Sequence, residues 1–168
     1  MPFNKLKIYN QLLDLLGLGE KERVISLKGV FNRDFEENTP TFLQKEIHPT
    51  PREDGEIPME TLLRQLTTEM TDKVTRTREF EMDRSVRLHW IRFHLEQKKK
   101  SNMLLFSVKE PEGVRTYYYD SDEKYVIILE PLRNLTAYYL ITAYFVKGKD
   151  AKRNKIEKKY KRRLDKVY

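Results

Sequence analysis

Residues 103–146 read MLLFSVKEPEGVRTYYYDSDEKYVIILEPLRNLTAYYLITAYFV, and this stretch decides the fold class. Runs rich in β-branched and aromatic residues are typical of strands, and four of them occur here, at 103–109, 114–120, 124–131 and 137–146. The separators are short and hold turn-forming residues, as hairpin connections do; they lie at 111–113, 121–123 and 133–134. We therefore expect a four-stranded antiparallel meander.

A helix is expected directly before this sheet. Residues 84–98, RSVRLHWIRFHLEQK, carry apolar side chains at helical spacing. A helix packed on the sheet predicts an α+β domain over 79–168, closed by a basic helix at 149–166. Residues 1–78 are expected to form an acidic, mostly helical accessory region. Its expected elements are a helix at 4–16, a possible strand at 23–31, a loop at 36–58 and a helix at 59–72.

The charge is divided unevenly along the chain. The net charge is +7, and it combines −4 over residues 1–83 (12 basic, 16 acidic) with +11 over residues 84–168 (21 basic, 10 acidic). Residues 147–168 alone hold 11 basic and 3 acidic side chains. A dense basic segment of this kind favours a polyanionic partner such as RNA. We expect Lys147, Lys149, Lys152 and Arg153 to contact the phosphate backbone.

Several functional classes are disfavoured by composition. The chain has no cysteine and three histidines, which leaves little basis for a metal site, and we expect no cofactor. No apolar run approaches the roughly 20 residues that a membrane span requires. The start of the chain does not read as a signal peptide. We therefore expect a cytoplasmic protein, or one delivered to the cytoplasm of a target cell, with no membrane association.

The helix expected at 84–98 presents two kinds of polar side chain. On a helical wheel, Arg87 and His94 lie between apolar clusters, whereas His89 and Arg92 lie on the opposite, accessible strip, where we expect Arg92 to contact RNA. A guanidinium in an apolar arc needs a partner, so Arg87 either meets a buried carboxylate or carbonyl or binds an anion at the lip of a pocket. His94 is either a satisfied core histidine or a catalytic one. His89 is a surface histidine unless another element folds over it.

The last strand offers hydroxyl groups on one face. In a regular strand the even positions 138–146 share a face, which puts Thr142 and Tyr144 side by side, while the odd positions belong to the core. In the second strand, Arg115, Tyr117 and Tyr119 also share a face. If the two faces coincide, these five side chains form a platform on which bases stack and phosphates bind. The alternative is that the tyrosines fill a half-buried sheet.

The ordered motifs resemble a known nuclease superfamily. RSVRLHWIRFHL is similar to the Arg-x-x-Arg-x-x-Trp-Ile helix of the phage- and toxin-associated nucleases of the barnase–EndoU–colicin D–RelE-like (BECR) superfamily. Thr142, Ala143 and Tyr144, followed by a basic segment, resemble the end of the last strand in that fold. The likeness covers residues 80–165. It implies metal-independent cleavage of RNA by attack of the ribose 2′-hydroxyl on the adjacent phosphate, with Arg84 and Arg87 binding that phosphate.

The resemblance also implies roles for other residues. Thr142 and Tyr144 would contact the scissile phosphate. His89 is the preferred proton-transfer group because it lies on the accessible strip, and His94 is the second choice. The expected function is therefore an endoribonuclease acting on transfer RNA or another RNA, with an immunity protein or antitoxin as a possible partner. The alternatives are a non-catalytic nucleic-acid-binding module and a phage-related interaction protein.

Overall fold

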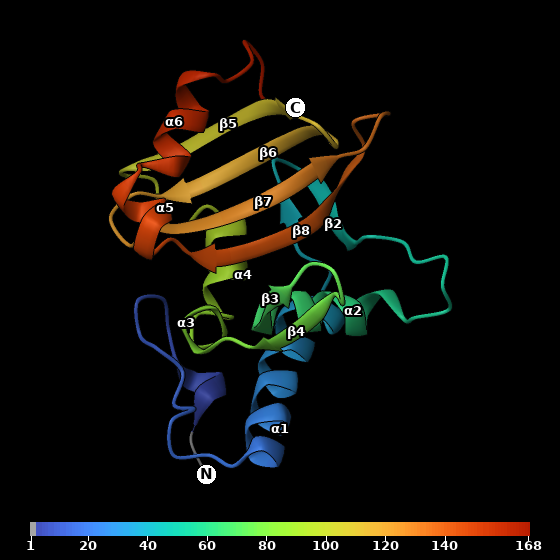
Figure 1. The fold of residues 1–168 in the computed structure, drawn as a ribbon, viewed down its shortest axis with the longest axis vertical. Helices are drawn as coiled ribbons and strands as arrows, with labels where there is room; N and C mark the ends of the chain where they lie inside the picture. Colours follow the sequence, from blue (N-terminus) through green and yellow to red (C-terminus); the bar gives the residue numbers. More distant parts are fainter. Residues whose placement is uncertain (1–2) are drawn as a thin grey trace.

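The computed structural model describes residues 3–168 as an α+β protein built on a six-stranded mixed sheet (Figure 1). The order of the strands is β1-β2-β8-β7-β6-β5. Their bounds are Thr41–Phe42 (β1), Lys45–Pro49 (β2), Met103–Glu110 (β5), Gly113–Asp120 (β6), Tyr125–Pro131 (β7) and Ala137–Phe145 (β8).

The four expected strands form the antiparallel meander β5-β6-β7-β8, but the sheet is larger than predicted. The expected loop at 36–58 contains β1 and β2, and β2 pairs in parallel with residues 137–140 of β8. This pairing satisfies backbone groups on β8 that would otherwise be a bare sheet edge. The prediction of a four-stranded antiparallel sheet is therefore wrong in strand number and direction, although the α+β class is confirmed.

The N-terminal region folds differently from the prediction. The expected helix at 4–16 is reduced to one 3₁₀ turn, Asn4–Leu6 (η1), and the expected strand at 23–31 lies in a helix, Glu20–Phe31 (α1). Helix α1 buries Leu27, Val30 and Phe31, which have helical spacing, and it runs into a π-helical turn, Asn32–Glu36 (η2). Residues after η1 instead bury Leu13 and Leu15, an alternation typical of extended chain.

Two further helices are shorter than predicted. The helix expected at 59–72 is α2, Pro58–Thr67, and its last residues form instead the strand β3, Thr68–Asp72, which pairs with β4, Thr77–Phe80. The helix expected at 84–98 is divided by a turn into α3, Met82–Ser85, and α4, Trp90–Leu95. The closing helix is likewise divided into α5, Gly148–Lys152, and α6, Lys155–Lys161.

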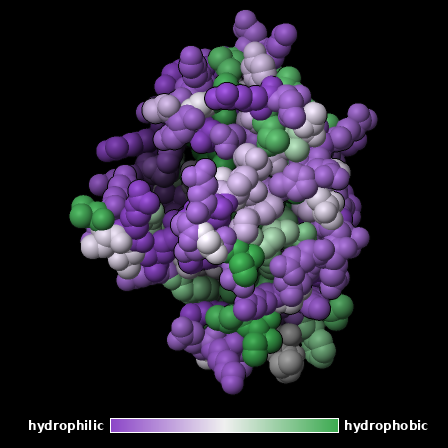
Figure 2. All heavy atoms as spheres, turned by 90° about the vertical axis from the view of Figure 1, so that its right-hand side faces the viewer, coloured by the Kyte–Doolittle hydropathy of each residue, from purple (hydrophilic) through white to green (hydrophobic). Residues whose placement is uncertain are grey.

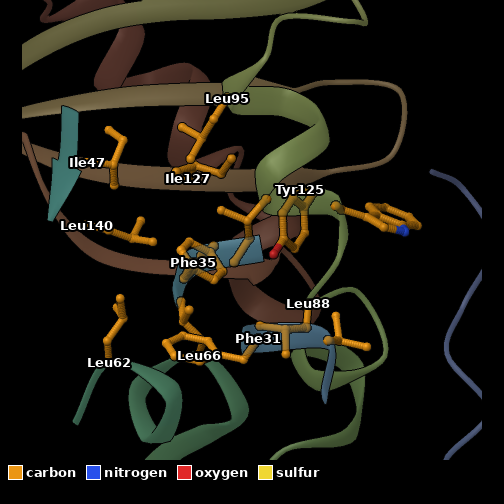
Figure 3. Close-up of a cluster of buried hydrophobic side chains, with 14 of the residues drawn as sticks. Phe31, Phe35, Ile47, Leu62, Leu66, Leu88, Leu95, Tyr125, Ile127 and Leu140 are labelled. Atoms are coloured by element: carbon orange, nitrogen blue, oxygen red, sulfur yellow. The ribbon is translucent and has the colours of Figure 1, made fainter. Parts of the chain in front are cut away.

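Both faces of the sheet bury apolar side chains. The larger cluster joins one face to α1, α2 and α4, and Figure 3 shows Phe31, Leu66 and Leu95 converging with Ile127 and Leu140 of β7 and β8. The smaller cluster lies on the other face, where Ile156 of α6 covers β5 and β6. No helix within residues 3–168 combines the length and the apolar character needed to cross a bilayer.

Candidate nucleic-acid interface

Helices α5 and α6 display the densest group of unpaired cations in the described chain. Residues 148–162 cross one face of the sheet and end beside β5 (Figure 1). Six of their basic side chains are exposed and form no ion pair with any of residues 3–168. They are Lys149, Lys152, Arg153, Lys158, Lys161 and Arg162. We call these six residues the basic surface.

Other cations of this segment are neutralised within the chain. Lys147 lies 2.7 Å from Glu81, and it also contacts Asp83, so it ties the end of β8 to α3. These two acids raise the pKa of Lys147. Two acids therefore already balance the charge of Lys147, and its contact with RNA stays a prediction. Lys149, Lys152 and Arg153, which are expected to contact RNA, are exposed and form no ion pair with any of residues 3–168.

The residues of the expected aromatic platform do share one face of the sheet, but other side chains cover its tyrosines on β6. The register places Tyr117 beside Ile128 and Thr142, and Tyr119 beside Val126 and Tyr144, so the four hydroxyl-bearing side chains share one face. However, Tyr117 and Tyr119 are 4% and 1% exposed. Base stacking on these two tyrosines is therefore wrong, and the alternative that they fill the sheet is correct.

The covering contacts explain this burial. The ring of Tyr117 stacks on Phe106 with a centroid separation of 5.2 Å, and its hydroxyl donates to Glu110 at 2.8 Å. Glu110 in turn pairs with Lys159 of α6. Burial and the Glu110 carboxylate raise the pKa of Tyr117 far above its usual value. Arg115 is also engaged, because its guanidinium lies 3.2 Å from Glu130, so its predicted contact with RNA is not supported.

A β-bulge changes which residues of β8 face the platform. Leu129 pairs with Leu140 but Ile128 pairs with Thr142, so Ile141 is the extra residue. The even-odd rule therefore fails at this point. Tyr138, Leu140 and Ala143 enter the larger core, whereas Ile141 packs on the α6 side.

Arg84, not Arg87, meets the hydroxyl-bearing strand. The guanidinium of Arg84 lies 5.6 Å from the ring centroid of Tyr144, and the ammonium of Lys155 lies 5.9 Å from the same centroid. Thr142 is two residues from Tyr144 on the same face and is half-buried. We call Arg84, Thr142, Tyr144 and Lys155 the Tyr144 cluster. Arg84 also donates to the carbonyl of Gln65 at 3.0 Å and lies 3.7 Å from Glu81, and Lys155 lies 3.3 Å from Asp150, so each cation of the cluster has an acidic neighbour.

Arg87 contacts a carbonyl and aromatic rings of its own chain, which is one of the two alternatives that the sequence left open. Its guanidinium lies 4.1 Å from the ring centroid of Phe145 and 5.2 Å from that of Trp90. It donates to the carbonyl of Asp83 at 2.6 Å, and burial lowers its pKa. Phe145 pairs with Tyr125, which belongs to the larger core, so Arg87 approaches the opposite face from Tyr144. The expected convergence of Arg87 with Thr142 and Tyr144 on one phosphate is therefore wrong.

Both candidate catalytic histidines are buried. His89 is 5% exposed because residues 8–11 fold over it, and its Nε2 lies 3.1 Å from the carbonyl oxygen of Ile8. Burial lowers the pKa of His89. The turn that separates α3 from α4 removes the outward strip on which the wheel had placed this residue. Arg92, which lies on the same expected strip, donates to the carbonyls of Asp34 and Asn38 and to the carboxylate of Glu96, so its guanidinium is engaged within the chain.

His94 belongs to a buried ionic cluster that the sequence did not reveal. His94 is 1% exposed, and its Nε2 lies 3.2 Å from Asp120, although not along a hydrogen-bond direction. Asp120 also pairs with Lys99 at 3.0 Å and accepts a hydrogen bond from the hydroxyl of Tyr9. Burial raises the pKa of Asp120, but these neighbours outweigh it and hold that pKa well below its usual value. We call these four residues the Asp120 cluster.

Three cations of the basic surface were not among the residues predicted to bind RNA. They are Lys158, Lys161 and Arg162. Their signal was present in the charge count of residues 147–168. No group of three or more acidic or histidine side chains arranged to hold a metal is found among residues 3–168. No protein-family model, curated protein or solved structure matches this chain.

Proposed function

We propose that this protein binds RNA through the basic surface on α5 and α6. The observation that carries the proposal is the set of six exposed cations on adjacent short helices, none of which is balanced by an acid within residues 3–168. Unpaired Lys and Arg release condensed counterions from a phosphate backbone, which drives binding. Elsewhere in the described chain several cations are balanced by acids, as in the Arg92–Glu96 pair, and the unpaired ones are not gathered on one pair of helices.

The salt dependence of binding tests this proposal quantitatively. If all six cations contact single-stranded phosphates, log K falls with log salt with a slope of about −4, since each contact contributes about −0.7. The affinity then falls roughly 300-fold between about 50 and 200 mM salt. The variant K152Q/R153Q should reduce the slope to about −3, as measured by fluorescence anisotropy with a labelled RNA.

A matched control separates the basic surface from total charge. Lys73 and Lys100 are also exposed and form no ion pair with the described residues, but they lie outside α5 and α6. K73Q/K100Q removes the same charge and should leave the slope near the wild-type value. Equal losses in the two double variants would refute the basic surface as the binding site.

A second candidate function is metal-independent cleavage of RNA at the Tyr144 cluster. It is favoured by the position of Tyr144 between two cations, Arg84 and Lys155. In the reaction that the nuclease resemblance implies, the 2′-hydroxyl gives its proton to solvent water as its oxygen bonds to phosphorus, and the bond from phosphorus to the 5′-oxygen breaks. Arg84 and Lys155 would stabilise the charge on phosphorus, and the Tyr144 hydroxyl would donate a proton to the leaving oxygen. The products are a 2′,3′-cyclic phosphate and a free 5′-hydroxyl, and Tyr144 regains its proton from solvent.

Incubation of RNA with the protein in EDTA tests this second function. Tyr144→Phe should abolish cleavage and retain RNA binding. The control is Tyr125→Phe, which should leave cleavage unchanged because the Tyr125 hydroxyl is buried inside the protein. Binding without cleavage by the wild-type protein would support the basic surface alone and dismiss the nuclease.

A further inference from the structure

The exposed apolar side chains of this protein are concentrated at one end. Seven of the twelve large apolar residues that are exposed lie between positions 3 and 25. They are Phe3, Leu6, Ile8, Leu12, Leu16, Val24 and Ile25. In Figure 2 apolar side chains gather at the lower end of the molecule, where Figure 1 places α1. Concentrated apolar surface of this kind marks an interaction site more often than scattered residues do.

The apolar surface continues into a groove. A cavity of about 780 Å³ lies between η1 and α1, and its apolar lining includes Phe3, Leu6, Leu18 and Ile25. Ile25 is 57% exposed and Val24 is 44% exposed, although both lie in the middle of a helix. An amphipathic helix that covered only the core of its own chain would not need these two residues to be apolar.

Helix α1 has a charge pattern that is complementary to itself. Glu20, Val24 and Lys28 are exposed and occur at four-residue spacing, so they form one stripe along the helix. Neither Glu20 nor Lys28 forms an ion pair with any of residues 3–168. If two copies of α1 pack antiparallel about a two-fold axis at Val24, Glu20 of each copy lies opposite Lys28 of the other.

We propose that two copies of this chain associate through α1 as a two-fold dimer. An isologous interface must be complementary to itself, and this stripe has an apolar centre with opposite charges at equal distances on either side. The groove beside η1 extends the contact. A standard interface buries about 800 Å² on each partner, which is roughly 8% of the 10291 Å² surface of this chain.

The position of α1 also keeps the dimer clear of charge repulsion. Each copy carries a net charge of +7, but the basic surface on α5 and α6 lies at the end of the molecule opposite α1 (Figure 1). At physiological salt, charges further apart than about 8 Å are largely screened. The α1 contact is therefore compatible with two strongly basic copies.

Sedimentation velocity of the whole chain at about 1 μM to about 1 mM tests the dimer. We expect a species of about 41 kDa, twice the 20.3 kDa monomer, that increases with concentration. Val24→Glu should shift the protein to the monomer. Val74→Glu, which changes a 93% exposed valine in the β3–β4 turn, is the control and should behave as wild type. A monomer throughout, or equal dissociation by both variants, would overturn the proposal.

A charge swap tests the two-fold geometry itself. E20K and K28E alone should each weaken the dimer, because each places like charges opposite one another at two symmetry-related positions. E20K/K28E should restore it. This double variant also reverses the favourable interaction of both residues with the helix dipole, so a purely structural role predicts that the double variant is the worst of the three. That result, or assemblies larger than a dimer, would refute the two-fold arrangement.

Discussion

Replacement of Asp120 by Asn is the most direct test of how the N-terminal segment is held to the sheet. The Asp120 carboxylate is 0% exposed, and it balances Lys99 while contacting His94 and the hydroxyl of Tyr9. Removing one partner from a buried ionic cluster costs about 3–5 kcal/mol, because the remaining charge is left without compensation. For a chain of 168 residues, each kcal/mol lowers Tm by about 2–4 °C. The expected decrease is therefore roughly 6–20 °C.

The stabilisation by Asp120 should also depend on pH, and its direction follows from the pKa of Asp120. The pKa of Asp120 is lower in the folded state than in the unfolded state. The unfolded state therefore binds more protons in acid, and the stability due to Asp120 is present above the unfolded pKa of about 4. This contribution is lost as the pH falls through the lower folded pKa. In D120N that acid-dependent loss should be smaller than in the wild-type protein.

Thermal unfolding followed by circular dichroism measures both effects. The control is Asp122→Asn, because Asp122 pairs with the same lysine at 3.0 Å but its side chain is 49% exposed. Solvent screens such a surface pair, so Tm should change little. A D120N variant that unfolds within a degree or two of D122N would refute the argument that the buried cluster stabilises the fold.

Other substitutions test separate contacts. Tyr125→Phe should raise stability by about 1 kcal/mol in denaturant unfolding, because the hydroxyl of Tyr125 is buried without a hydrogen-bond partner; a loss of stability would contradict this. Burial lowers the pKa of His89, so protonation of this residue favours the unfolded state and the wild-type protein loses stability between about pH 7 and pH 5. In His89→Gln this loss of stability should be smaller, and an equal loss in both proteins would refute the argument. Tyr138→Phe removes the hydroxyl that donates to the main-chain oxygen of Tyr168 at 2.7 Å, so hydrogen exchange of residues 164–168 should become faster while that of β7 does not change.

The strands of the meander could be predicted because their signals are local. Each run between 103 and 146 is β-branched or aromatic, and each separator is short, so sequence neighbours are also neighbours in the sheet. Whether the faces that carry Tyr117 and Tyr144 coincide was left open by the sequence, and the register of the strands shows that they do. The bulge at Ile141 did not, because nothing in the alternation of β8 marks an extra residue.

The N-terminal region could not be predicted because long-range contacts determine its conformation. Residues 8–11 are held by side chains that lie about 80 positions away, as when the indole of Trp90 donates to the carbonyl of Gln11 at 3.0 Å. Leu13 likewise donates its backbone N–H to Val86 at 2.9 Å. These bonds stabilise an extended segment whose leucine spacing resembled that of a helix. The same segment covers His89. The exposure predicted for His89 therefore failed for the same reason as the helix predicted at 4–16.

The two covered faces of the sheet limit where any chemistry on RNA can occur. The larger core occupies one face, and α6 closes the other over Tyr117 and Tyr119, so the centre of the sheet is closed to a nucleotide. Beyond residue 140, β8 is no longer paired with β2, and there α3 contributes Arg84 while α6 contributes Lys155. Tyr144 is thus the one hydroxyl of the expected platform that lies between two cations and remains half-buried rather than buried. On the proposed function, a phosphate backbone bound along α5 and α6 would therefore meet the sheet at this end of β8, and not at its closed centre.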